Sequence, residues 1–131
     1  MKLLLDTHIW IWSHLEPGRL IPAVAAALED SKTELWLSPI SIWELLVLVG
    51  KGRVTLTSEV DDWVSLALDR APMNEAPLTH EVALATRSID LPHNDPADRL
   101  LAATATVLGL TLVTADRRLI EAPGLSVFAN R

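Results

Sequence analysis

The chain has 131 residues, half of them hydrophobic, with no cysteine and a formal net charge of −6 from 11 Lys and Arg against 17 Asp and Glu. This composition excludes a disulfide framework, a thiolate metal site and a cysteine nucleophile, and it argues against nucleic-acid binding by bulk electrostatic attraction. No apolar run reaches the roughly 20 residues of a membrane span, so we expect a single soluble domain over residues 1–131, located in the cytoplasm and not in a membrane.

The first predicted element is a strand that runs directly into a carboxylate. Residues 3–5 are all Leu, without polar alternation, which is typical of a parallel strand buried on both faces. Ligands of such sheets bind beyond the carboxyl ends of the strands, so Asp6 is a candidate site residue. Asp6 fits equally well as the N-cap of a helix over residues 7–14, and this stretch alone does not separate the two roles.

A helix over residues 22–29 and a second strand over residues 34–38 lead to a very apolar helix. Residues 42–49 are apolar all round except at Glu44. Such a helix should be buried, and a buried carboxylate needs a cation or hydrogen-bond donors. Ser41 and Glu44 also match a capping box, in which Glu44 would bond back to the start of the helix.

The next segment carries no candidate site residue. Residues 58–70 have apolar side chains on one stripe and acidic ones on the opposite face, which predicts an amphipathic surface helix. Residues 75–78 predict a short third strand, and Thr79 should cap a helix over residues 80–89. We expect His80 to be exposed, and we discount zinc because no second His accompanies it at ligand spacing.

A strong helix start follows at Asp95, where Asp at the N-cap precedes Pro96 at the first helical position. Asp98 shares a helical face with Ala102 and Ala105, whose small side chains allow this helix to approach the sheet closely. We therefore expect the Asp98 carboxylate to point over the strand ends, and we interpret Asp95 as a helix cap. Gly109 should end the helix.

The last two strands complete an alternating pattern. Residues 110–114 predict a strand that runs into Asp116, as residues 3–5 run into Asp6, and residues 125–128 predict a fifth strand. Strands that alternate with helices predict an α/β/α sandwich with a mostly parallel five-stranded sheet.

Four carboxylates therefore belong to strand-to-helix junctions: Asp6, Glu44, Asp98 and Asp116. Gathered at one edge of the sheet they would repel one another unless a cation lay among them. Oxygen ligands without Cys or His favour Mg²⁺ or Mn²⁺, which can activate water for phosphodiester hydrolysis. Neither glycine-rich phosphate-binding motif is present, which disfavours nucleoside-triphosphate and dinucleotide functions.

Four segments of the chain, in this order, resemble the PIN-domain ribonucleases, specifically the VapC toxins of VapBC toxin–antitoxin systems: LLLDTHIW at 3–10, SIWE at 41–44, DPADRLLAA at 95–103 and LVTADR at 112–117. The resemblance implies a PIN-like sheet of order 3-2-1-4-5 and Mg²⁺-dependent endoribonuclease activity on RNA. It also implies a small antitoxin partner, bound across the active-site groove, and a homodimer.

The same resemblance assigns the family's catalytic and metal-binding quartet to the four junction carboxylates, Asp6, Glu44, Asp98 and Asp116. It makes three further residues supporting positions: Thr7, Thr114 and Arg99. Ala97 departs from the pattern, because many relatives carry an aromatic residue there.

Five tryptophans in so short a chain leave two interpretations open, because they are either all core residues or include some on a surface that meets another chain. The second interpretation leads to an alternative function, a non-catalytic PIN-fold interaction module. A third function, a phosphatase or phospho-acceptor domain with Asp6 as nucleophile, is disfavoured because the chain lacks the second Asp and the late-strand Lys that it would need.

Overall fold

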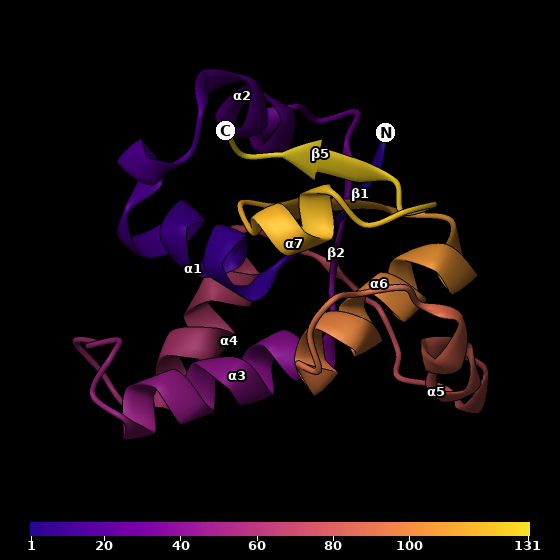
Figure 1. The fold of residues 1–131 in the computed structure, drawn as a ribbon. Helices are drawn as coiled ribbons and strands as arrows, with labels where there is room; N and C mark the ends of the chain where they lie inside the picture. Colours follow the sequence, from indigo (N-terminus) through magenta and orange to yellow (C-terminus); the bar gives the residue numbers. More distant parts are fainter.

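Five parallel strands form one sheet in the computed structural model, which describes residues 1–131 (Figure 1). The strands are β1 Lys2–Leu5, β2 Glu34–Leu37, β3 Asn74–Glu75, β4 Thr111–Thr114 and β5 Val127–Ala129. Their order, β3-β2-β1-β4-β5, confirms the predicted topology. Because β1 and β4 are parallel neighbours at the centre, the residues that follow them, Asp6 and Asp116, emerge at the same edge of the sheet.

Helices connect these strands and cover the sheet: α1 Thr7–Leu15, α2 Pro22–Glu29, α3 Pro39–Gly50, α4 Val60–Arg70, α5 His80–Ala85, α6 Pro96–Leu108 and α7 Arg117–Ile120. Two short 3₁₀ segments, Pro17–Arg19 and Thr86–Ser88, lie between them. In Figure 1, α3 and α4 lie on one side of the molecule and α5 and α6 on the other. None of the helices has the length and apolar character that crossing a lipid bilayer would require.

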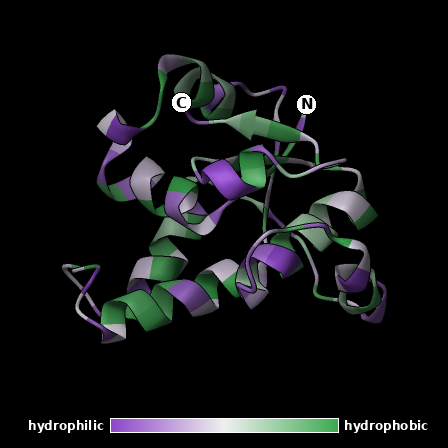
Figure 2. Ribbon diagram, in the orientation of Figure 1, coloured by the Kyte–Doolittle hydropathy of each residue, from purple (hydrophilic) through white to green (hydrophobic).

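The central strand explains why residues 3–5 show no polar alternation. Successive side chains of a strand point to opposite faces. Leu3 and Leu5 belong to one core cluster, together with residues of α1 to α4, whereas Leu4 belongs to a second cluster with residues of α6 and α7. All three leucines are fully buried, so helices cover the strand on both faces. Most of α3 is also coloured as hydrophobic in Figure 2, but only Ser41 and Leu45 are buried in it, so the expectation of a buried helix was wrong.

The boundaries of three predicted elements were wrong. The third strand is Asn74–Glu75, shorter than predicted, although the next N–H, that of Ala76, still donates to the Leu37 carbonyl at 2.9 Å. The helix predicted over residues 80–89 ends at Ala85 and continues as a 3₁₀ turn, in which the Thr86 hydroxyl donates to the Ala83 carbonyl at 2.6 Å. The last strand is Val127–Ala129, shifted from the predicted residues 125–128.

The capping box predicted at Ser41 was also wrong. Helix α3 begins earlier, at Pro39, and its N-cap is Ser38, whose hydroxyl accepts from the Ile40 N–H at 3.1 Å. Proline is favoured at the first helical position, since its missing N–H would have no partner there. Glu44 therefore lies more than a turn inside α3 and does not cap it, so its half-buried carboxylate needs another explanation.

Candidate functional site

The four predicted carboxylates reach one cavity of about 500 Å³ at the carboxyl ends of β1 and β4. The cavity is lined by Asp6, His8, Trp12, Glu44, Asp95, Asp98, Ala115, Asp116 and Arg118. These residues come from segments far apart in the sequence, which the strand order brings to one edge of the sheet.

Asp6 serves both as a helix cap and as a wall of the cavity. Its Oδ1 accepts from the Thr7 N–H at 2.8 Å, as an N-cap does, and its Oδ2 accepts from the Thr114 hydroxyl at 2.6 Å. The Thr114 Oγ1 also accepts from the Asp116 N–H at 3.0 Å, so this buried threonine links the two strand-end aspartates. Burial, with added repulsion from Asp98, raises the pKa of Asp6 to about 6.

Glu44 is tied to the same end of β1 through Thr7. The fully buried Thr7 hydroxyl donates to Glu44 Oε1 and lies 2.9 Å from the Ser41 hydroxyl oxygen. Burial raises the pKa of Glu44, and repulsion from Asp6 and Asp98 adds to that shift, although the bond from Thr7 opposes it. Both predicted threonines, Thr7 and Thr114, thus hold carboxylates of the cavity in place.

Asp98 has a neighbour that the sequence did not reveal, His93. The His93 Nε2 lies 2.7 Å from Asp98 Oδ2, and both side chains are largely buried. Burial raises the pKa of Asp98, whereas the hydrogen bond to His93 lowers it. His93 belongs to a loop before the helix cap Asp95, at a spacing from Asp98 that matches no ligand motif, so no sequence signal pointed to it.

Arg99 supports the site indirectly. Its guanidinium donates to backbone carbonyls of the loop before α6, at 2.8 Å to Ile89, 3.4 Å to Leu91 and 3.5 Å to His93. Arg99 therefore holds the loop that presents His93 to Asp98, and it makes no hydrogen bond with a carboxylate of the cavity. Asp95 is confirmed as the N-cap of α6, since its Oδ1 accepts from the Ala97 and Asp98 N–H groups.

Asp116 is the one carboxylate of the four with an arginine partner. The Arg118 guanidinium donates to both of its oxygens, at 3.2 and 3.0 Å, and lowers the pKa of Asp116. The side chain of Arg118 is 52% exposed, so it is free to turn toward another anion. The sequence analysis did not assign a role to Arg118, although it follows Asp116 by only two residues.

The residues at this edge fit a hard divalent cation. His93, Asp98 and Asp116 each offer a ligand atom within 4.8 Å of the others. Three of the four carboxyl groups, those of Asp6, Glu44 and Asp98, have raised pKa values, with burial as the main cause and mutual repulsion as a further one. A cation among them would favour their ionised forms, and oxygen donors with a single His nearby suit Mg²⁺ or Mn²⁺ better than zinc.

Comparison with known families agrees with this geometry. A family model described as the PIN domain matches residues 3–125, nearly the whole chain. The chain belongs to the PIN-domain family. Ribonuclease VapC22 of Mycobacterium tuberculosis is 38% identical to it over 120 residues, which are 89% of this chain and 88% of that protein.

Solved structures of PIN proteins share the fold. The structure of VapBC2 from Rickettsia felis, bound to a DNA fragment from its promoter, superposes with a TM-score of 0.74 at 18% identity and covers 98% of both chains. FitAcB from Neisseria gonorrhoeae superposes with a TM-score of 0.63 at 26% identity, over 98% of this chain and 97% of that one. This chain thus shares its fold with VapBC2 and FitAcB.

Proposed function

We propose that the 131 residues form a single PIN domain that is a Mg²⁺- or Mn²⁺-dependent endoribonuclease, the toxin of a type II toxin–antitoxin pair. The observation that carries this proposal is the convergence of Asp6, Glu44, Asp98 and Asp116 on one cavity, three of them with raised pKa values. The 38% identity to a protein named a ribonuclease supports the choice of RNA as substrate.

In this proposal Asp6, Asp98 and Asp116 hold the cation, and Glu44 adds negative charge beside them. A Mg²⁺ or Mn²⁺ ion bound there would lower the pKa of a coordinated water and offset the charge of the scissile phosphate. Thr114 and Thr7 fix the orientations of Asp6 and Glu44. His93 engages one oxygen of Asp98, so the other oxygen is left for the cation.

The substrate phosphate must be attracted locally, because the chain carries a net charge of −6. Arg118 is the nearest guanidinium to the carboxylates, and we propose that it moves from Asp116 to the phosphate once a cation neutralises that carboxylate. A further basic rim adjoins the cavity, since a neighbouring pocket of about 580 Å³ shares His8 and Trp12 with it and includes Arg19 and Arg53.

A small antitoxin is the proposed protein partner, and a homodimer the proposed state of the free toxin. Support for the antitoxin comes from a structure that this chain resembles, the toxin–antitoxin complex from Klebsiella pneumoniae, which superposes with a TM-score of 0.69 at 20% identity. An endoribonuclease of this kind would act on cytoplasmic RNA. Sedimentation of the purified chain, alone and with the product of an adjacent antitoxin-sized reading frame, tests both assignments.

The activity itself is tested by incubating purified protein with structured RNAs in Mg²⁺, in Mn²⁺ and in chelator. Cleavage should require the metal and should be lost in Asp6→Asn. Asp69→Asn, which neutralises an exposed carboxylate at the far end of α4, is the matched control and should cleave normally. Cleavage that persists in chelator would contradict a carboxylate metal site, and absence of cleavage with every metal and RNA would favour the non-catalytic interaction module.

A further inference from the structure

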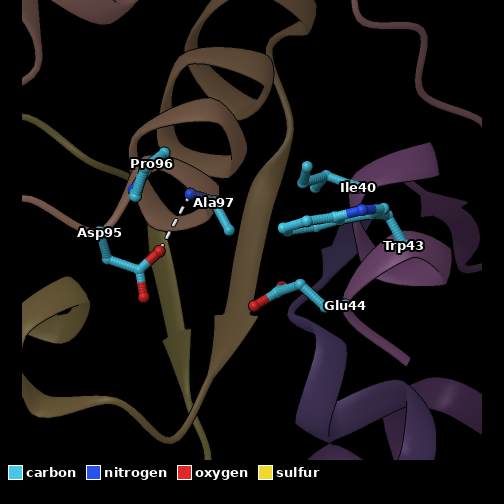
Figure 3. Close-up of a pocket in the computed structure, with 6 residues that line it drawn as sticks. All are labelled: Ile40, Trp43, Glu44, Asp95, Pro96 and Ala97. Carbon is cyan, nitrogen blue, oxygen red and sulfur yellow. Dashed lines mark hydrogen bonds between the residues drawn. The ribbon is translucent and has the colours of Figure 1, made fainter. Parts of the chain in front are cut away.

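A second pocket, of about 470 Å³, adjoins the carboxylate cavity between the N-terminal parts of α3 and α6 (Figure 3). Its six lining residues are Ile40, Trp43, Glu44, Asp95, Pro96 and Ala97. Glu44 and Asp95 line both spaces, so the pocket is continuous with the proposed cleavage site. A group bound in this pocket would therefore lie directly beside the cavity that takes the scissile phosphate.

The pocket offers an aromatic face. Figure 3 shows the Trp43 indole projecting from α3 toward α6, with Ile40 on one side and Glu44 on the other. The Trp43 side chain is 55% exposed, which is unusual for so large an apolar group, whereas Trp10 is fully buried. Ala97 lies opposite the ring, and because its side chain ends at Cβ, the space between Ala97 and the Trp43 indole stays open.

The polar groups of the pocket are hydrogen-bond acceptors. Asp95 Oδ1 is occupied by the N–H groups of Ala97 and Asp98, while Asp95 Oδ2 makes no hydrogen bond. In the same way, Glu44 Oε1 is occupied by Thr7 and Oε2 makes no bond. A fitting ligand is therefore flat and apolar on its faces and carries N–H donors on one edge.

We infer that the pocket binds an unpaired RNA base beside the scissile phosphate, with the base stacked on Trp43 and its Watson–Crick edge on the Asp95 carboxylate. This inference rests on the proposed function for the identity of the polymer. Stacking on aromatic side chains is how single-stranded RNA is commonly recognised. An apolar side chain from a protein partner fits less well, because it would bury the Glu44 and Asp95 carboxylates without supplying donors.

Guanine should bind best. The pocket has two free acceptor oxygens, Asp95 Oδ2 and Glu44 Oε2. Guanine alone among the four RNA bases presents two adjacent N–H donors, N1–H and N2–H, on its Watson–Crick edge. Uracil presents one N–H between two carbonyl oxygens, which the carboxylate repels. We expect at least about tenfold tighter binding of guanosine than of uridine, at the lower end of the discrimination that a bidentate base contact provides.

Nucleosides test this pocket without cleavage or metal. The ¹⁵N-labelled protein has five tryptophan indole N–H signals, and the signal that is missing from the spectrum of Trp43→Phe is that of Trp43. Guanosine titrated in chelator should shift the Trp43 signal saturably and leave the other four in place. Followed by the backbone N–H signals of the pocket residues, Trp43→Leu should abolish saturable binding, and Leu66→Ala, which shortens an exposed apolar side chain of α4, should leave it unchanged.

The variant Asp95→Asn tests the proposed contact between the base and Asp95 most directly. Asn is as good an N-cap as Asp, so α6 should keep its start. The Asn oxygen must keep accepting from the Ala97 and Asp98 N–H groups, so an NH₂ donor replaces the free Oδ2 and faces the N–H donors of guanine. The preference for guanosine over uridine should therefore be lost. Equal binding of both nucleosides by the parent, or an unchanged preference in Asp95→Asn, would overturn the inference.

Two further outcomes separate this inference from its alternatives and from the proposed function. A Trp43 signal that moves with protein concentration and not with guanosine would show that a second copy of the chain covers the pocket, and the base site would be wrong. Metal-dependent RNA cleavage without any nucleoside shift would likewise refute the pocket alone. Guanosine binding in a protein that cleaves no RNA would leave the pocket standing and refute the proposed function.

Discussion

Replacing Asp6 with Asn is expected to stabilise the metal-free protein at neutral pH while it abolishes RNA cleavage. In the absence of a cation, burial and repulsion from Asp98 oppose the ionised form of Asp6. The amide of Asn carries no charge, accepts from the Thr7 N–H as Asp6 does, and can meet the Thr114 hydroxyl oxygen with its own N–H. The substitution therefore removes an electrostatic penalty and keeps the cap of α1.

The size of the effect follows from the pKa of Asp6, which rises from 3.8 to about 6 on folding. Because the folded-state value is the higher one, the unfolded chain ionises first as pH rises, and the native state loses stability between these two pH values. Above pH 6 the loss is complete and amounts to about 3 kcal/mol, while at pH 5 it is roughly half of that. Below pH 3.8 both states are protonated and Asp6 contributes nothing.

Urea denaturation in chelator at pH 7.5 and at pH 5 measures this difference. Asp6→Asn should exceed the parent in free energy of unfolding by up to about 3 kcal/mol at pH 7.5 and by about half as much at pH 5. The control Asp69→Asn should change stability by no more than about 0.5 kcal/mol at either pH, as exposed substitutions usually do. Saturating Mg²⁺ should raise the stability of the parent more than that of Asp6→Asn.

Two results would refute this reasoning. An Asp6→Asn protein that is no more stable than the parent at pH 7.5 in chelator would mean that the Asp6 carboxylate carries no penalty in the fold. An equal gain at both pH values would mean that the stabilisation comes from packing or hydrogen bonding and not from charge. Loss of cleavage in a more stable protein, by contrast, cannot be attributed to misfolding.

Three further predictions concern the other groups of the site. Glu44→Gln should keep the fold, because Ser38 and not Glu44 caps α3, and it should keep the contact with Thr7. Cleavage at saturating Mg²⁺ should nevertheless become at least about tenfold slower, which corresponds to about 1.4 kcal/mol in the activation barrier. An undiminished rate would mean that only three carboxylates serve the site. His93→Ala should weaken Mg²⁺ binding by about 10- to 100-fold, measured by calorimetry without RNA, and His93→Gln should restore part of the affinity. His80→Gln, which changes an exposed histidine, is the control. Equal Mg²⁺ affinities of His93→Ala and the parent would remove His93 from the site. Mg²⁺ or Mn²⁺ at about 100 times its dissociation constant should stabilise the native state by roughly 2.7 kcal/mol, and melting curves that overlay the chelated sample would argue against a metal site.

The sequence could predict the buried central strands and the positions of Asp6 and Asp116 because these follow from burial. Residues 3–5 are apolar on both faces, as are Leu112 and Val113, which is typical of a covered parallel strand, and the residues after such strands emerge at the edge of the sheet. The strand order itself came from the family resemblance. The predicted end of the helix after Thr79 was wrong because a local hydrogen bond of Thr86 accompanies the change to a 3₁₀ turn.

The remaining parts of the site depend on contacts that a sequence pattern does not encode. His93 reaches Asp98 because Arg99 holds the intervening loop, and no periodicity links these three residues. The role of Glu44 depended on where α3 begins. Pro39 favoured the start that is observed, with Ser38 as N-cap, over a later start with a capping box at Ser41. A proline just after a favoured N-cap residue was the stronger of the two signals.

The same carboxylates that destabilise the fold would couple it to the proposed cation. Burial raises the pKa values of Asp6, Glu44 and Asp98, so a cation bound among them would displace protons and would bind more tightly as pH rises. Arg118 already neutralises Asp116, so that carboxylate needs no proton to be tolerated. The site therefore combines one carboxylate whose ionised form Arg118 already favours with three whose ionised forms a bound cation would favour. A cation there would let a chain with a net charge of −6 approach a polyanion, because it would offset the negative charge where the proposed site takes the phosphate.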